Sequence, residues 1–300
     1  MIEQDYIIRD LKRKTWVTNI KIAMFMIFLI LEIFLIVLFI KNNNLLKTEP
    51  IGDKIAIVEF NKEINTKYVH EIMSEMDEVK NKKDYKEILF IMNSPGGSPA
   101  ASEEMSEYLK DYTKTKKITM YVEGMAASGG YYIASSIKPL IANKNAIVGS
   151  IGVIMPHYNI SDLAKKIGVE EDYLAAGKYK KPISPFRKIT QEDEDYIVKQ
   201  IISPMYENFM KSVAINRDIK LEKVRELAEG KVYLANDPEI KNFLVDEISA
   251  LYKIQKDMRE KYPKIKFYNI TQKENKSIFG TNIKLDLNID EAIKNLGELR

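Results

Sequence analysis

A serine surrounded by very small residues is the feature of this sequence best suited to chemistry. Ser128 lies within Gly124–Tyr132, where Ala-Ala precedes it and Gly-Gly follows it. Residues 117–122 read as a strand and residues 131–136 suit a helix. A serine at a strand-to-helix turn, with a backbone N–H beside it, has the geometry of a catalytic nucleophile. The alternative is a small polar residue in tight helix packing, and this segment alone favours neither.

A glycine-rich turn, Asn93–Ser98 (Asn-Ser-Pro-Gly-Gly-Ser), follows a strand pattern at 87–92 and precedes a helical pattern at 100–112. Such a turn can cradle a phosphate, but neither G-x-x-x-x-G-K-[ST] nor G-x-G-x-x-G is present. It can also form an oxyanion hole, because glycine lets a carbonyl oxygen approach the backbone closely. A simple tight turn is the third interpretation.

Composition limits the chemistry that can assist Ser128. The chain has no cysteine, which excludes thiol catalysis and disulfides, and its two histidines, His70 and His157, lie in no metal-binding or catalytic pattern. We therefore expect no metal and no cofactor. The 46 basic and 43 acidic residues are dispersed, so no nucleic-acid partner is expected. Ser135–Lys138 matches S-x-x-K of penicillin-binding enzymes, but the companion S-D-N and K-T-G segments are absent.

An N-terminal apolar run predicts a transmembrane anchor. Residues 22–40 are apolar except for Glu32 and, at 19 residues, would span roughly 28 Å as a helix. No small-residue cleavage site follows, so the anchor should remain uncleaved. More Lys and Arg precede the span than follow it, which predicts cytoplasmic residues 1–21 and an extracytoplasmic remainder. We interpret Glu32 as a tolerated acid or one that faces a partner helix.

The rest of the chain predicts one α/β domain. We expect a tether at 41–53, a domain at 54–270 and a polar C-terminal tail at 271–300. Alternation of strands and helices indicates βαβ units and a largely parallel sheet with flanking helices. The expected strands are 55–60, 87–92, 117–122, 140–142 and 149–154, and the expected helices are 68–79, 100–112, 128–136 and most of 191–229.

Four sequence blocks together resemble the signal peptide peptidase A family, the serine–lysine membrane proteases also called protease IV. The blocks are Asn93–Ser98, Met125–Tyr132, Gly149–Val153 and Gly177–Phe186, and their order matches. The resemblance covers roughly residues 53–250. It implies a fold like that of the Clp protease and the crotonases, one protease domain per chain and assembly into a homo-oligomeric ring.

The resemblance also implies roles for single residues. Ser128 matches the nucleophile, Lys180 the general base and Ser150 the serine that orients the lysine amine. The N–H groups of Gly97 and Gly129 match the oxyanion hole. The base segment holds three nearby lysines, so Lys178 and Lys181 stay open as alternatives to Lys180. A lysine acts as a base only when neutral, and burial can lower its ordinary pKa of about 10.4 by as much as 3–5 units.

These features predict a single-pass serine endopeptidase of the bacterial cell membrane that degrades cleaved signal peptides and other apolar or unfolded peptides. Its partners would be these peptides and the lipid bilayer. Two alternatives come from other functional classes. One is a non-proteolytic membrane scaffold of the same fold, which intact Ser128 and Lys180 disfavour. The other is a crotonase-like acyl-CoA enzyme, which an extracytoplasmic domain disfavours.

Overall fold

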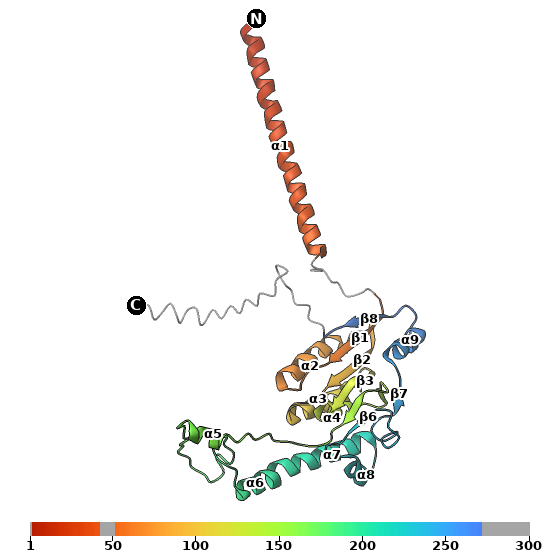
Figure 1. Cartoon of the computed structure of the whole chain (residues 1–300). Coiled ribbons are helices and arrows are strands. Elements are labelled where there is room, and N and C mark those ends of the chain that lie inside the picture. Colours follow the sequence, from red (N-terminus) through yellow and green to blue (C-terminus); the bar gives the residue numbers. More distant parts are fainter. Residues whose placement is uncertain (1, 43–51, 272–300) are drawn as a thin grey trace. The chain divides into compact units, whose positions relative to one another are not determined.

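The computed structural model describes residues 2–42 and 52–271, which belong to two separate compact units (Figure 1). The first unit contains the helix α1 (Ile2–Asn42). Its stretch Arg13–Phe39 is long and apolar enough to cross a membrane, and every side chain in that stretch is exposed. The expected span 22–40 lies within α1. Most of the expected tether and all but the first residue of the expected tail lie outside the described residues.

The second unit is built on one mixed sheet of eight described strands, in the order β6-β5-β3-β2-β1-β8, with β4 beside β3 and β7 beside β4. Every pair is parallel except β5 with β6. The strands are β1 (Lys54–Phe60), β2 (Tyr85–Ser94), β3 (Ile118–Ala127), β4 (Leu140–Ala142), β5 (Ile147–Gly149), β6 (Val232–Leu234), β7 (Glu247–Ile248) and β8 (Lys266–Asn269).

Helices connect these strands, as the sequence pattern predicts. Asn65 and Ser98 each begin a helix by accepting a hydrogen bond on the side-chain oxygen from a backbone N–H three residues on. The helices are α2 (Thr66–Lys80), α3 (Pro99–Tyr112), α4 (Gly129–Ala134), α5 (Ser161–Lys166), α6 (Gln191–Ile197), the π-helix η1 (Val198–Ile202), α7 (Ser203–Arg217), α8 (Leu221–Leu227) and α9 (Leu251–Lys261).

The central strands are buried on both faces, which explains their continuous apolar runs. Along β2, Phe90 packs in the larger core cluster with residues of α2 and α3. Its neighbour Leu89 points the other way and packs in a second cluster with Ile254 and Met258 of α9. Helices therefore cover both faces of the sheet, and the C-terminal ends of the strands form one of its edges.

Two expected elements differ in the structure. The strand expected at 149–154 is wrong, because β5 ends at Gly149 and Ser150 turns the chain with a φ of 53°. Residues 151–160 then run without regular secondary structure. The strand expected at 117–122 continues to Ala127 as β3, after a register shift against β2. This extension carries the chain directly to Ser128.

Candidate active site

Ser128 joins β3 to α4 in a strained conformation, with a φ of 53° and a ψ of −124°. A positive φ at a non-glycine residue costs on the order of 1–3 kcal/mol and persists only where the surroundings enforce it. Here the Ser128 N–H donates to the Gly149 carbonyl at 2.9 Å, and the Ser128 carbonyl accepts from the Tyr132 N–H at 3.0 Å. The turn places a half-buried serine at the C-terminal edge of the sheet, where α/β folds commonly bind ligands.

The two glycines after Ser128 allow α4 to pack closely against its neighbours. A Cβ at Gly129 would lie 2.3 Å from Ser102 Oγ on α3. A Cβ at Gly130 would lie 2.7 Å from the Ser94 carbonyl oxygen at the end of β2. The small residues around Ser128 therefore serve tight packing as well as an open approach to the serine, so the two interpretations of this segment are compatible.

The turn at Asn93–Ser98 lies directly against Ser128. A Cβ at Gly96, whose φ is +106°, would lie 2.8 Å from Ser128 Cβ and 2.9 Å from the Gly129 nitrogen. Ser94 holds this turn in place, because its Oγ donates to the Lys62 carbonyl at 2.6 Å and accepts from the Gly96 N–H at 3.3 Å. Only glycine fits this approach, which is why the motif needs it at position 96.

Two backbone donors remain unused beside Ser128. The Ile64 N–H donates to the Gly96 carbonyl, and the Ser98 N–H donates to the Ile64 carbonyl, both at 2.8 Å. Because alternate peptide groups of extended backbone face opposite sides, the Gly97 N–H points away from Ile64. Gly129 is the first residue of α4, so its N–H has no partner within the helix. Neither N–H donates to another described residue, and such donors can stabilise an oxyanion.

Strand pairing brings Ser150 beside Ser128. Ala127 of β3 pairs with Gly149 of β5, so the residues that follow them, Ser128 and Ser150, lie side by side at the same edge. Both serines have a φ of 53°. Ser150 is half-buried, and its N–H donates to the Lys231 carbonyl at 2.7 Å. The side chains of two serines predicted to act together are thus held by neighbouring, equally strained turns.

Lys180 is not joined to these serines in the structure. It is exposed, in the loop between α5 and α6, and its side chain forms no hydrogen bond or ion pair with a described residue. In Figure 1 this loop lies beside α5, at the end of an extended arm away from α4. We call residues 151–190 the arm. It leaves the sheet just after Ser150, and the chain returns along α6, η1 and α7. The arm therefore begins at the site although Lys180 lies in the loop between α5 and α6.

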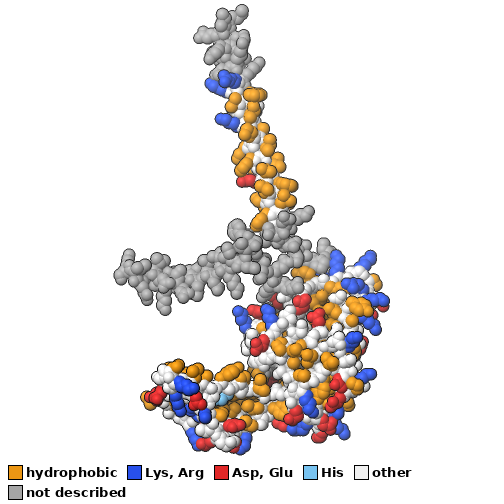
Figure 2. Space-filling view, viewed as in Figure 1, with side chains coloured by type: hydrophobic (Ala, Val, Ile, Leu, Met, Phe, Trp, Pro, Cys, Tyr) orange, Lys and Arg blue, Asp and Glu red, His pale blue; other side chains and the backbone are white. Residues whose placement is uncertain are grey.

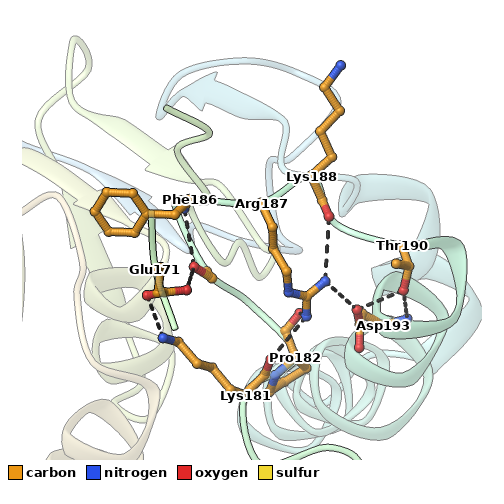
Figure 3. A network of polar contacts seen from close by, with 9 residues as sticks. Glu171, Lys181, Pro182, Phe186, Arg187, Lys188, Thr190 and Asp193 are labelled. Atoms are coloured by element: carbon orange, nitrogen blue, oxygen red, sulfur yellow. Dashed lines mark hydrogen bonds and ion pairs between the residues drawn. The ribbon is translucent and has the colours of Figure 1, made fainter. Parts of the chain in front are cut away.

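The two lysines on either side of Lys180 are both ion-paired. Lys178 binds Glu192, and this hydrogen bond raises the pKa of Lys178. Lys181 binds Glu171, which also accepts from the Ser184 hydroxyl (Figure 3). Lys178 and Lys181 are each bound to a carboxylate, whereas Lys180 has no such partner among the described residues. Lys180 is therefore the member of the group best able to serve as a base.

Arg187 fixes the loop that carries these lysines. Its guanidinium donates to the carbonyls of Lys181 at 3.0 Å and Pro182 at 2.8 Å, and to the Asp193 carboxylate at 2.9 Å (Figure 3). Asp193 also accepts from the Thr190 hydroxyl at 2.7 Å, at the start of α6. The hydrogen bond from Thr190 and then that from Arg187 lower the pKa of Asp193. The loop is thus locally ordered although it is exposed.

Neither histidine is joined to Ser128, Ser150 or Lys180 in the described part of the chain. His70 is exposed on α2, and His157 lies in the arm with a buried Nε2 atom that has no described hydrogen-bond partner. Sequence reasoning missed two contributors. Ser94 belongs to the glycine-rich motif, so its spacing could have signalled a role in the turn. Ile64 gave no signal, because its bridge to Gly97 joins segments that no local pattern connects.

Comparisons with known proteins agree with this architecture. The model of the family "Peptidase family S49" matches residues 110–264, and that of "Clp protease" matches residues 51–149. "Putative protease MJ0651" of Methanocaldococcus jannaschii is 36% identical over 222 residues, which cover 73% of this chain and 70% of that protein. "Putative signal peptide peptidase SppA" of Enterococcus faecium is 33% identical over 186 residues, which cover 60% of this chain and 53% of that protein.

Among solved structures, a mutant of ClpP1 from Listeria monocytogenes aligns with a TM-score of 0.45 at 16% identity. The alignment covers 66% of this chain and 92% of that one. The Clp protease family match includes β1 to β5 and both glycine-rich motifs. Together with the mixed sheet and its flanking helices, this match confirms the predicted Clp-like α/β fold.

Proposed function

The chain belongs to peptidase family S49, and we propose that it is a membrane-anchored serine endopeptidase with Ser128 as nucleophile and Lys180 as general base. The observation that carries this proposal is the strained Ser128 turn, flanked by the unused N–H groups of Gly97 and Gly129. Backbone strain at a half-buried serine, maintained by tightly packed glycines around it, is typical of a functional position. A serine with only a packing role would not require it.

The proposed reaction uses these groups in order. Ser128 Oγ attacks the carbonyl carbon of a peptide bond and transfers its proton to the Lys180 amine. The carbonyl oxygen becomes an oxyanion, which accepts hydrogen bonds from the N–H groups of Gly97 and Gly129. The protonated amine then gives its proton to the departing peptide nitrogen, which leaves an acyl-enzyme. Water, deprotonated by the same lysine, attacks that ester, and the lysine returns the proton to Ser128 Oγ as the second peptide leaves with a free carboxylate. Ser150, beside Ser128, orients the amine by a hydrogen bond.

This mechanism requires the arm to deliver Lys180 to a serine and to bury it there. Apolar side chains along the arm support such burial, because soluble monomers seldom expose so many in one segment. They include Ile154, Tyr158, Leu163, Ile167, Val169 and Leu174. A second copy of the chain, placed as in the proposed ring, would cover this surface. The lysine of one protomer would then serve the serine of its neighbour.

The proposed substrates are extended apolar peptides, including signal peptides released after cleavage. The name of the Enterococcus relative supports this class for that protein. The small residues around Ser128 leave room for a peptide backbone, and sites facing a ring interior would exclude folded chains. The apolar stretch of α1 supports a single membrane anchor, and the Lys and Arg residues before it favour a cytoplasmic N-terminus.

The decisive experiment is peptide hydrolysis by the full chain and its Ser128→Ala form. The variant should lose activity by roughly 10⁴-fold or more while its thermal unfolding stays close to wild type, because alanine adds no volume. A fluorophosphonate should label the wild type at Ser128. A scaffold or an acyl-CoA enzyme would show neither hydrolysis nor labelling, and wild-type rates in Ser128→Ala would refute the nucleophile.

A further inference from the structure

The edge of the sheet opposite Ser128 concentrates positive charge. Since β1, β2, β3 and β8 are parallel neighbours, their first residues lie together at this edge. The segments that reach it are 52–54, 80–87, 110–117 and 256–266, at the starts of these strands and the ends of α2, α3 and α9. We call their surface the basic edge.

The charge balance of the basic edge differs from that of the remaining chain. Its four segments contain fourteen Lys and Arg against six Asp and Glu, whereas the whole chain has 46 against 43. The edge thus carries an excess of eight positive charges, and all other residues together carry an excess of five negative charges. The basic residues are Lys54, Lys80, Lys82, Lys83, Lys86, Lys110, Lys114, Lys116, Lys117, Lys256, Arg259, Lys261, Lys264 and Lys266.

Ordinary structural roles account for part of this charge. Four of these residues lie in the last turns of α2, α3 and α9, where the helix dipole favours cations. Others form ion pairs, such as Lys54 with Asp84 at 2.5 Å. However, Lys83, Lys264 and Lys266 are exposed and form no ion pair with a described residue. Figure 2 shows Lys and Arg side chains over β8 and α9. The surface therefore keeps a positive excess toward solvent.

The short segment between α1 and β1 favours a membrane as the partner of the basic edge. β1 begins at Lys54, and α1 ends at Asn42, so eleven residues separate them. Eleven residues reach at most about 40 Å, so the chain length lets the basic edge reach a bilayer that α1 crosses. Anionic headgroups attract lysines that lie within roughly a Debye length of a membrane surface. We propose that the basic edge binds anionic phospholipid headgroups of the bilayer that holds the anchor. This inference rests on the membrane anchoring proposed above.

Lipid binding at this edge has a consequence for the candidate active site. Ser128 follows the last residue of β3, whose ten residues rise about 33 Å from the basic edge. A domain docked through the basic edge directs Ser128 away from the bilayer. Substrate peptides must then leave the membrane before cleavage, which fits a site that binds them in extended form.

A fluorescence experiment on the full chain in lipid vesicles tests the docking. The chain has no cysteine, so a single Asn81→Cys substitution places a fluorophore at the basic edge, and Asn61→Cys places one near the Ser128 edge. A lipid with a headgroup quencher should quench the label at position 81 in vesicles of phosphatidylglycerol and phosphatidylcholine. Quenching should weaken in phosphatidylcholine alone, and also at about 1 M salt, where the screening length falls to about 3 Å. The label at position 61 should stay unquenched.

Charge reversal supplies the matched control. Lys83→Glu, Lys264→Glu and Lys266→Glu together should weaken quenching at least about tenfold. Lys144→Glu, Lys211→Glu and Lys241→Glu make the same charge change at exposed positions outside the basic edge and the arm, and should leave quenching intact. Equal quenching in both lipids, or equal loss in both triple variants, overturns the proposal. The lysine-to-glutamate variant of the basic edge is also tested for binding to soluble polyphosphate. If it loses polyphosphate binding but its quenching by lipid is unchanged, the ligand of the basic edge is a soluble polyanion and the proposal is overturned. A chain that does not stay with the vesicles refutes the anchor itself.

Discussion

Ser128 and Lys180, the two halves of the proposed dyad, are held by opposite kinds of structure. Ser128 is fixed by backbone hydrogen bonds and by glycines packed against it, at the end of a buried strand. Lys180 lies on an exposed arm whose loop is held by the side chains of Arg187, Glu171 and Asp193. The proposed nucleophile and the proposed oxyanion donors therefore lie together within one chain, whereas the proposed base lies on an exposed arm.

This difference has a mechanistic meaning. A lysine in water stays protonated at neutral pH, and desolvation is what makes it a base. In a chain whose arm is uncovered, the proposed oxyanion donors would be in place while Lys180 was not joined to Ser128. Activity would then depend on assembly, which would confine proteolysis to the closed ring and spare other proteins.

The largest effect should come from the base. Lys180→Ala should reduce kcat by roughly 10⁴-fold, and Lys180→Arg should do the same, because a guanidinium keeps its proton. Lys178→Ala and Lys181→Ala are the matched controls and should retain most activity, since both lysines are committed to carboxylates. Peptide hydrolysis by the four variants decides the assignment. Activity in Lys180→Ala, with loss in either control, would move the base to that residue.

The oxyanion hole should give the next largest effect. Gly97→Ala should lower kcat by about 10²–10³-fold, because the new Cβ would lie 2.2 Å from the Ile64 carbonyl oxygen and would displace the Gly97 N–H. Gly168→Ala is the control, since Gly168 has a φ of +72° but open space around it. Both substitutions strain the backbone, so equal losses of activity would mean that strain, and not the donor, explains the effect.

The sequence predicted the strands and turns that carry Ser128 better than it predicted the position of Lys180, and the reason is physical. The strands that carry Asn93–Ser98 and Ser128 are continuous apolar runs with glycines at their ends, and these signals are local. β8 has only four residues, Lys-Phe-Tyr-Asn, and pairs with β1 from some 200 residues away, so no local signal revealed it. The prediction of a strand at 149–154 was wrong because Ser150 adopts a positive φ, and a serine in the sequence does not indicate such a conformation. The position of Lys180 depends on packing of the arm, which no local pattern sets.

Mixing two inactive variants should restore part of the activity. If the arm of one protomer serves the serine of its neighbour, a mixed ring of Ser128→Ala and Lys180→Ala chains pairs an intact serine with an intact lysine at about one quarter of its sites. The two variants must be coexpressed or reassembled together, and hydrolysis is compared with each alone. No recovery in rings shown by mass to contain both chains would mean that each arm folds onto its own domain.

The smallest effect should come from the side chains that order the arm. Arg187→Ala removes the donors to the Lys181 and Pro182 carbonyls, so amide hydrogen exchange across 177–188 should accelerate while exchange in α4 stays unchanged. Arg225→Ala breaks a comparable exposed ion pair between Arg225 on α8 and Glu207 on α7, and it should leave the arm unaffected.

The order of the arm should also depend on pH. A hydrogen bond from Thr190 lowers the pKa of Asp193 below its ordinary 3.8, and one from Lys181 lowers the pKa of Glu171 below its ordinary 4.5. Their contribution is therefore complete above about pH 4.5 and is lost as the pH falls through the lowered values. The same amides should loosen in acid in the wild type. If acid loosens α4 as much as the arm, the two halves of the site do not differ in the way that their contacts imply.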